Sequence, residues 1–96
     1  MIVNNDIRLR NGIVKGIHIK LKNSNLIIIN APNGFLMCGY LDMKTANKLG
    51  DIAAMVTGVN TIGDALDAKI MDLSNEAKKM GLKKGITGRA FLNSIL

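Results

Sequence analysis

Hydrophobic and polar residues alternate along the first part of the chain as they do in β-strands. From Gly16 to Lys22, isoleucine and leucine alternate with histidine and lysine, which predicts a strand that buries its aliphatic side. The Asn11-Gly12 pair lies between two apolar runs and predicts a hairpin, because both residues tolerate positive φ. Leu26–Ile29 does not alternate, so this strand is expected to be covered on both sides. A turn at Pro32–Gly34 predicts a fourth strand over residues 35–38.

After residue 41 the pattern changes to short, alternating helices and strands. Each expected helix begins at or after a residue whose side-chain oxygen can cap it, and two of the four end at a glycine. The helices are expected through Leu49 after Asp42, around residues 65–68 after Thr61 or Asp64, over 74–80, and from Thr87 to Leu96; short strands are expected over 52–56 and 69–73. This order predicts an α/β fold of the α+β type, with an N-terminal meander and with helices mainly on one face of the sheet.

Length and composition add an expectation about assembly. The 96 residues fit one domain, 1–96, with a β-rich region over 1–41 and an α/β body over 42–96. Of these residues 48% are hydrophobic, which is more aliphatic material than so small a domain easily hides. All expected helices follow residue 41, so one face of the N-terminal sheet has no cover in the chain. We therefore expect the N-terminal β region to pair with other copies of the protein.

Charge and the single cysteine bear on the expected binding partners and cellular location. The net charge is +6, and residues 1–33 carry five basic side chains against Asp6 alone. This excess permits nucleic-acid binding through a basic sheet face, but the face has no aromatic residue for base stacking. The alternative is a solvated face that keeps an edge strand from aggregating. No apolar leader or membrane-length run is present and Cys38 has no partner for a disulfide, so a cytoplasmic location without membrane contact is expected.

Cys38 is the first candidate for chemistry. A nucleophilic thiol needs a nearby base, and the only histidine, His18, lies on a different expected strand. Asp42 could orient such a base, yet a buried, inert thiol is the alternative interpretation. One cysteine and one histidine do not complete a four-ligand soft metal site, so neither a metal nor a cofactor is expected.

The remaining candidates are binding residues. Glycine corners after Thr57 and Thr87 could present backbone N–H groups to a carboxylate or phosphate, and Arg89 could clamp the same anion. Tyr40 could place its hydroxyl in a pocket or use it for packing. The candidate ligand-binding residues are Gly39, Tyr40, Asp42, Thr57, Gly58, Gly88 and Arg89.

Four motifs in the last 60 residues carry a family resemblance. They are Met37-Cys38-Gly39-Tyr40-Leu41-Asp42, Lys48-Leu49-Gly50-Asp51, Thr57-Gly58-Val59 with Thr61, and Gly85-Ile86-Thr87-Gly88-Arg89-Ala90. With them the chain resembles the YunC-like family of bacterial and archaeal proteins, a domain of unknown function (DUF1805). The resemblance implies an N-terminal β region that assembles into tetramers, joined to an α/β body. It implies no substrate, cofactor or catalytic residue.

These patterns leave three functions open. The first is a non-catalytic, homo-oligomeric module, a tetramer by the resemblance, that binds a small molecule or a protein. The second is a small enzyme that uses Cys38 as its nucleophile. The third and weakest is nucleic-acid binding through the basic N-terminal sheet face.

Overall fold

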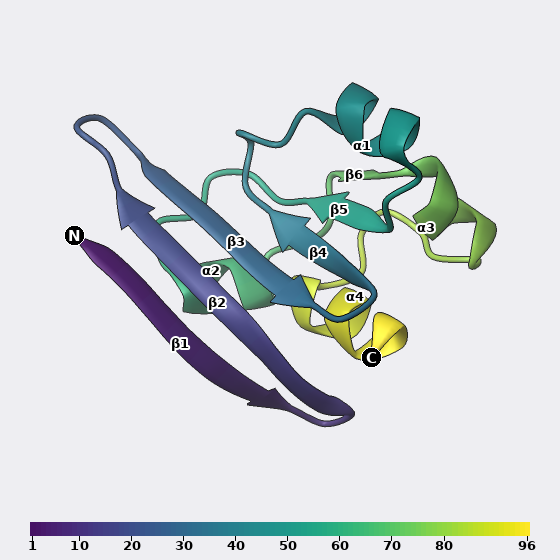
Figure 1. Cartoon of the computed structure of the whole chain (residues 1–96), viewed down its shortest axis with the longest axis horizontal. Coiled ribbons are helices and arrows are strands. Elements are labelled where there is room, and N and C mark those ends of the chain that lie inside the picture. Colours follow the sequence, from purple (N-terminus) through teal and green to yellow (C-terminus); the bar gives the residue numbers. More distant parts are fainter.

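A six-stranded sheet with four short helices forms the protein, as a computed structural model of residues 1–96 shows (Figure 1). The strands lie side by side in sequence order. They are β1 (Ile2–Leu9), β2 (Gly12–Lys20), β3 (Asn25–Ala31), β4 (Gly34–Met37), β5 (Ala53–Met55) and β6 (Asp72–Leu73). The helices are α1 (Met43–Leu49), α2 (Ile62–Asp67), α3 (Asn75–Lys79) and α4 (Gly88–Ile95). The predicted α+β fold with an N-terminal meander is confirmed.

The first four strands form an antiparallel meander, and β5 then joins β4 in parallel. The expected hairpin at Asn11-Gly12 joins β1 to β2, and Pro32 begins the turn between β3 and β4. Because β4 and β5 are parallel, the chain crosses over between them through α1. This crossover leaves the ends of β4 and β5 at the same edge of the sheet.

Side-chain caps start all four helices, as the sequence predicts. Asp42, Thr61, Ser74 and Thr87 each accept a hydrogen bond from a backbone N–H two or three residues later. The helix expected around residues 65–68 begins earlier, at Ile62, because Thr61 is its cap. None of the four helices is long and apolar enough to cross a membrane.

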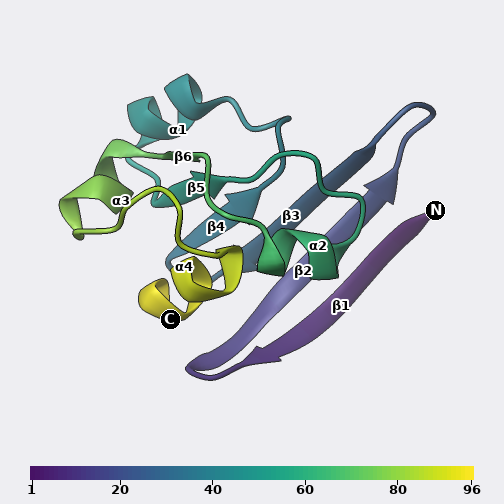
Figure 2. The same cartoon turned by 180° about the vertical axis from the view of Figure 1, so that it is seen from behind.

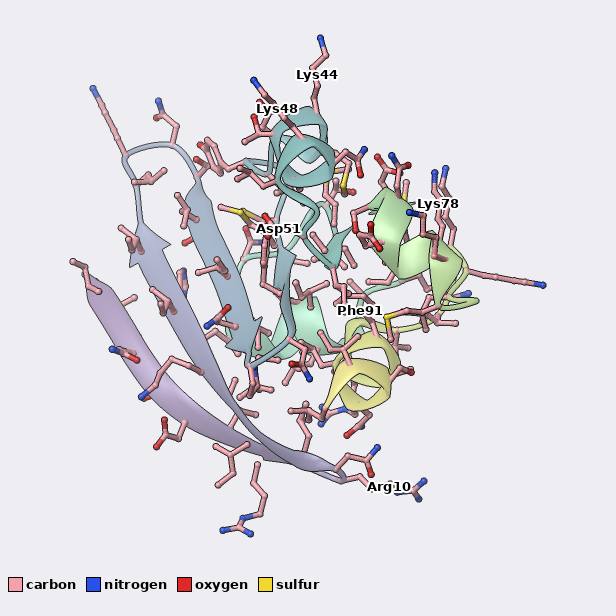
Figure 3. All side chains as sticks on the ribbon, turned by 45° about the vertical axis from the view of Figure 1, so that its right-hand side comes forward. Arg10, Lys44, Lys48, Asp51, Lys78 and Phe91 are labelled. Carbon is pink, nitrogen blue, oxygen red and sulfur yellow. The ribbon has the colours of Figure 1, made fainter.

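The hydrophobic core lies between the sheet and helices α2 and α4, which cover the same face of it (Figure 2). From the sheet, Ile27 and Ile29 are 1% and 0% exposed. From α4, Phe91 and Leu92 are fully buried. Figure 3 shows Phe91 between α4 and the sheet. These two helices therefore leave the opposite face of the N-terminal strands without cover from α2 or α4.

The buried side of β2 differs from the prediction. A Cβ added to Gly16 would lie 3.0 Å from Ile62 Cδ1 of α2, so Gly16 faces the helices. Since side chains alternate along a strand, His18 lies on this inner side, and Ile17 and Ile19 lie on the outer side. The prediction that the isoleucines of β2 form its buried side is therefore wrong. The lack of a side chain at Gly16 lets α2 approach this strand. The alternation of hydrophobic and polar residues in the sequence does not show where a helix will pack.

The outer side of the meander is an uncovered apolar surface, which we call the open sheet face. The sequence predicts cover on both sides of β3, but within one chain Leu26 and Ile28 are only half-buried. Cross-strand register places further apolar residues beside them, and none of the set belongs to the core or packs against it. The open sheet face comprises Ile2, Ile13, Ile17, Ile19, Leu26, Ile28 and Phe35.

The basic residues of the N-terminal third do not share one face. The register places Arg8 and Lys15 on the open sheet face, where Lys15 forms an ion pair of 2.7 Å with Asp6. Lys20 lies on the opposite side of β2, and Arg10 lies at the tip of the β1–β2 hairpin (Figure 3). The expected basic sheet face is therefore divided between two sides of the sheet.

Candidate functional site

A hollow of about 420 Å³ lies where three segments of the chain meet, and we call it the turn pocket. The segments are the β2–β3 turn, the end of β4 and the loop that follows β5. Its lining residues are Asn23, Ser24, Asn25, Cys38, Gly39, Tyr40, Gly58, Val59 and Asn60. This volume falls within the range of small-molecule sites.

Strand pairing brings these segments together. The backbone N–H of Cys38 donates to the Ile27 carbonyl oxygen at 3.0 Å, which places the end of β4 beside the β2–β3 turn. Met37 of β4 pairs with Met55 of β5 in parallel, so both strands end at the same edge. In parallel α/β sheets ligands commonly bind outside the carboxyl ends of the strands, and β4 and β5 are the parallel pair of this sheet. The turn pocket occupies such a position.

Four of the predicted site residues line this pocket, namely Cys38, Gly39, Tyr40 and Gly58. Thr57 lies next to them, since a Cβ added to Gly39 would lie 3.9 Å from the Thr57 Cγ2. Gly58 has a φ of 69°, in the left-handed region that favours glycine. The sequence therefore identified two of the three segments of the pocket, the end of β4 and the loop after β5.

Cys38 is a buried part of the pocket wall, only 4% exposed. Its Sγ accepts a hydrogen bond from the Ile27 N–H at 3.4 Å and lies 3.8 Å from the Asn25 carbonyl oxygen. No hydrogen bond joins the thiol to a side-chain base. His18, the base considered from sequence, bonds to the Asn25 side chain instead. This arrangement matches a packed thiol, and nucleophilic catalysis by Cys38 stays an untested prediction.

A chain of side-chain hydrogen bonds supports the polar wall of the pocket. His18 Nε2 lies 2.8 Å from Asn25 Oδ1, and Asn25 Nδ2 donates to Asn60 Oδ1 at 3.3 Å. Beside this chain, the hydroxyl groups of Ser24 and Tyr40 are hydrogen-bonded to each other. Neither residues 23–25 nor Asn60 are among the candidate residues predicted from the sequence. Their polar composition was the only signal, and it did not show that the two segments meet.

Asp42 does not line the turn pocket and acts as the cap of α1. Hydrogen bonds lower the pKa of its carboxyl group, and the largest contribution comes from the Thr45 hydroxyl, which donates at 2.7 Å. The backbone N–H groups of Thr45 and Lys44 lower this pKa further. Its role in the structure is therefore helix initiation.

Gly88 and Arg89 also lie outside the pocket. Gly88 is buried against α2, where an added Cβ would come within 2.3 Å of the Ala65 carbonyl oxygen. Arg89 forms an ion pair of 3.5 Å with Asp67 of α2, and both side chains are well exposed. The Thr-Gly-Arg motif thus joins α4 to α2 and does not meet the corner at Gly58.

Side chains that could ligate a metal are dispersed over the molecule. No three histidine, cysteine, aspartate or glutamate side chains gather closely enough to hold a metal ion.

Residues 37–95 match the family described as "Domain of unknown function (DUF1805)". The chain belongs to this family. A DUF1805 relative, "Uncharacterized protein YunC" of Bacillus subtilis, is 33% identical over 78 residues, which cover 77% of each protein. The crystal structure of a protein of unknown function from Thermoplasma acidophilum is similar with a TM-score of 0.94 and 36% identity, over 100% of this chain and 94% of that one.

The resemblance stated from the motifs is thus confirmed, and no activity comes with it. The DUF1805 match contains two walls of the turn pocket, the end of β4 and the loop after β5. The third wall, residues 23–25, precedes the matched segment.

Proposed function

We propose that this protein is a cytoplasmic, homo-oligomeric module that binds a small molecule in the turn pocket without catalysing a reaction. The observation that carries the proposal is the meeting of three distant segments around a hollow of about 420 Å³ with a polar wall. Small-molecule sites are commonly pre-formed hollows of this size with a few polar groups in the wall. Strand pairing holds the ends of β3 and β4 beside the hollow, and the turn and loop residues of the wall continue from the strand ends, which favours a site formed before a ligand arrives.

Binding without catalysis accounts for the groups in the pocket. The Cys38 thiol is buried and contacts no base, and no aspartate or glutamate lines the hollow. General acid–base catalysis requires a titratable group within reach of the ligand. The hydroxyl and amide groups that are present can position a ligand through hydrogen bonds.

Self-association through the open sheet face is the second part of the proposal. The face places Ile17 opposite Ile28 at its apolar centre, with charged and amide side chains around it. Asp6 lies on this face together with Arg8 and Lys15, so both signs of charge are present. A second copy related by two-fold symmetry can bring its Asp6 near Arg8 of the first copy. Two-fold pairing through this face alone gives a dimer. The tetramer implied by the family resemblance therefore needs a second interface elsewhere on the protein.

Native mass spectrometry of gently purified protein tests both parts. We expect an oligomer, and we expect a small-molecule adduct that is reduced in a Tyr40→Ala variant, because this change removes a wall of the pocket. The matched control is Met71→Ala, at another exposed large side chain outside the pocket. Equal adducts in both variants would contradict binding in the turn pocket. Turnover of a substrate that Cys38→Ser abolishes would contradict the non-catalytic part.

A pair of lysine substitutions tests the assembly surface. Ile28→Lys places a charge at the centre of the open sheet face, so we expect dissociation to folded monomers. Leu49→Lys makes the same kind of change at a residue of α1 that is 70% exposed and lies off this face. It should leave the oligomer intact. Assembly that survives Ile28→Lys, with circular dichroism showing a folded chain, would overturn the proposed interface.

A further inference from the structure

The side-chain hydrogen bonds behind the turn pocket run in one direction. Asn25 donates through Nδ2 to Asn60 Oδ1, so its own Oδ1 faces His18 Nε2. A ring nitrogen opposite a carbonyl oxygen must carry the hydrogen, which fixes His18 as the donor. The chain of donors therefore begins at His18 and ends at Asn60. There, Nδ2 with its two N–H groups has no acceptor in the protein.

The hydroxyl and thiol groups of the wall also form hydrogen bonds within the protein, whereas the Asn23 side chain has no partner there. One hydroxyl of the Ser24–Tyr40 pair accepts from the other, which leaves one O–H free to donate. The Cys38 sulfur already accepts from the Ile27 N–H. The side chains therefore offer a ligand donors, namely Asn60 Nδ2 and one hydroxyl O–H, together with acceptors on the hydroxyl groups and on the Asn23 amide.

Backbone groups of the same wall add further donors. The N–H groups of Gly39, Tyr40, Gly58 and Val59 donate to no acceptor in the chain. Val59 is only 9% exposed, and an N–H at such a position normally has a partner. These donors belong to the end of β4 and to the loop after β5, on two sides of the hollow. A ligand in the pocket can therefore be approached by N–H groups from two segments.

Electrostatics of the pocket also favour a ligand rich in acceptors. No aspartate or glutamate lines it, and the Asp64 carboxylate, which accepts the Asn60 backbone N–H at 3.1 Å, lies outside the lining. The protein carries a net charge of +6, which attracts anions from solution. Neutral N–H donors arranged around a concave site can hold an oxyanion without a cationic side chain.

We infer that the turn pocket binds the oxyanion group, carboxylate or phosphate, of a small molecule. The inference rests on the proposed binding function and names the chemistry of its ligand. Asn60 Nδ2 and the unpaired backbone N–H groups hold the oxygens, and His18 and Asn25 act as positioning residues that fix the orientation of the Asn60 amide. A ligand that donates hydrogen bonds to free carbonyl oxygens of these loops is the alternative.

Amide NMR of the 96-residue protein distinguishes an oxyanion ligand from a ligand that donates hydrogen bonds. Phosphate, acetate, acetamide and glycerol are titrated separately at constant ionic strength, with chloride as the reference anion. We expect saturable shifts from an oxyanion at the backbone amides of Gly39, Gly58 and Val59 and at the side-chain amide of Asn60. The acetate and phosphate titrations show which of the two groups the pocket prefers.

A matched pair of substitutions locates the effect. Asn60→Asp keeps the oxygen that accepts from Asn25 but replaces the donor with a negative charge, so affinity should fall at least tenfold. Asn75→Asp makes the same change at the start of α3, outside the pocket, and should change affinity less than twofold. Equal losses in both variants would mean that net charge alone attracts the anion, which overturns the inference.

The remaining outcomes separate the inference from the proposed function. Shifts at these amides with acetamide or glycerol, and none with either anion, would overturn the oxyanion inference while leaving a binding pocket in place. No shift at these amides with any probe would overturn the oxyanion inference by itself. The proposed binding function would then depend on whether the Tyr40-dependent adduct is found by mass spectrometry.

Discussion

Gly88 lies against Ala65 so closely that a Cβ at position 88 would come within 2.3 Å of the Ala65 carbonyl oxygen. The same Cβ would lie 2.7 Å from Leu36 Cδ2 of β4. This contact lets α4 pack on α2 and on the sheet at the same time. It also explains why a Gly-Arg motif that resembles an anion-binding corner has a structural role in this protein.

Gly88→Ala should therefore destabilise the protein by about 2–3 kcal/mol, because a backbone oxygen cannot move aside as a side chain can. The matched control is Gly63→Ala in α2, where the nearest atom to an added Cβ is Thr61 Oγ1 at 3.8 Å. That change should stabilise the protein by about 0.5–1 kcal/mol, since alanine favours helices over glycine. Urea denaturation measures both, and a neutral Gly88→Ala would contradict the close contact.

Ser74 is a buried hydroxyl that joins three segments. Its Oγ donates to the Asp51 carbonyl oxygen at 2.7 Å and accepts from the N–H groups of Ala53 and Ala77. Ser74→Ala leaves these groups without partners, and we expect a loss of about 2–3 kcal/mol in the free energy of unfolding. Ser94→Ala, at an exposed residue of α4, should change stability by less than about 0.5 kcal/mol. Similar losses in both variants would argue against the buried role of Ser74.

Asp42 makes helix initiation dependent on pH. Its pKa is lowered in the folded protein, chiefly by the Thr45 hydroxyl, so its ionised form stabilises the fold above the unfolded pKa near 3.8. This contribution is lost as pH falls through the lowered folded pKa. The stability difference between wild type and Asp42→Asn should thus be present at pH 7 and shrink below about pH 4. A difference that stays constant down to pH 3 in urea denaturation would contradict this.

The hydrogen-bond direction behind the turn pocket predicts the tautomer of His18. In its neutral form His18 should carry the hydrogen on Nε2, because Asn25 Oδ1 accepts there at 2.8 Å. Long-range ¹H–¹⁵N correlation spectra distinguish the two ring nitrogens directly. An Asn25→Ala variant provides the control, since it removes the acceptor and should restore a mixture of tautomers. A neutral Nδ1–H form in the wild-type protein would contradict the proposed direction.

The sequence predicted best those features that depend on residues close together along the chain. The hairpin at Asn11-Gly12 and the caps Asp42, Ser74 and Thr87 are confirmed, because turns and helix starts are decided within a few residues. The family motif at the end of β4 also placed Cys38, Gly39 and Tyr40 at the candidate site. Local patterns thus predicted the elements, their order and four of the nine residues that line the pocket.

Tertiary packing decided what those patterns could not. Gly16 faces α2, so the neighbouring isoleucines of β2 lie on the opposite side of the sheet. The side of β2 that is buried depends on where the distant helix packs, and alternation along the strand does not determine it. Asn25 and Asn60 are 35 residues apart and meet only because β4 and β5 end at the same edge of the sheet. The sequence alone determined the fold class and the local caps and turns. Which side of the sheet is buried, and which polar groups face the pocket, follow from contacts between distant segments.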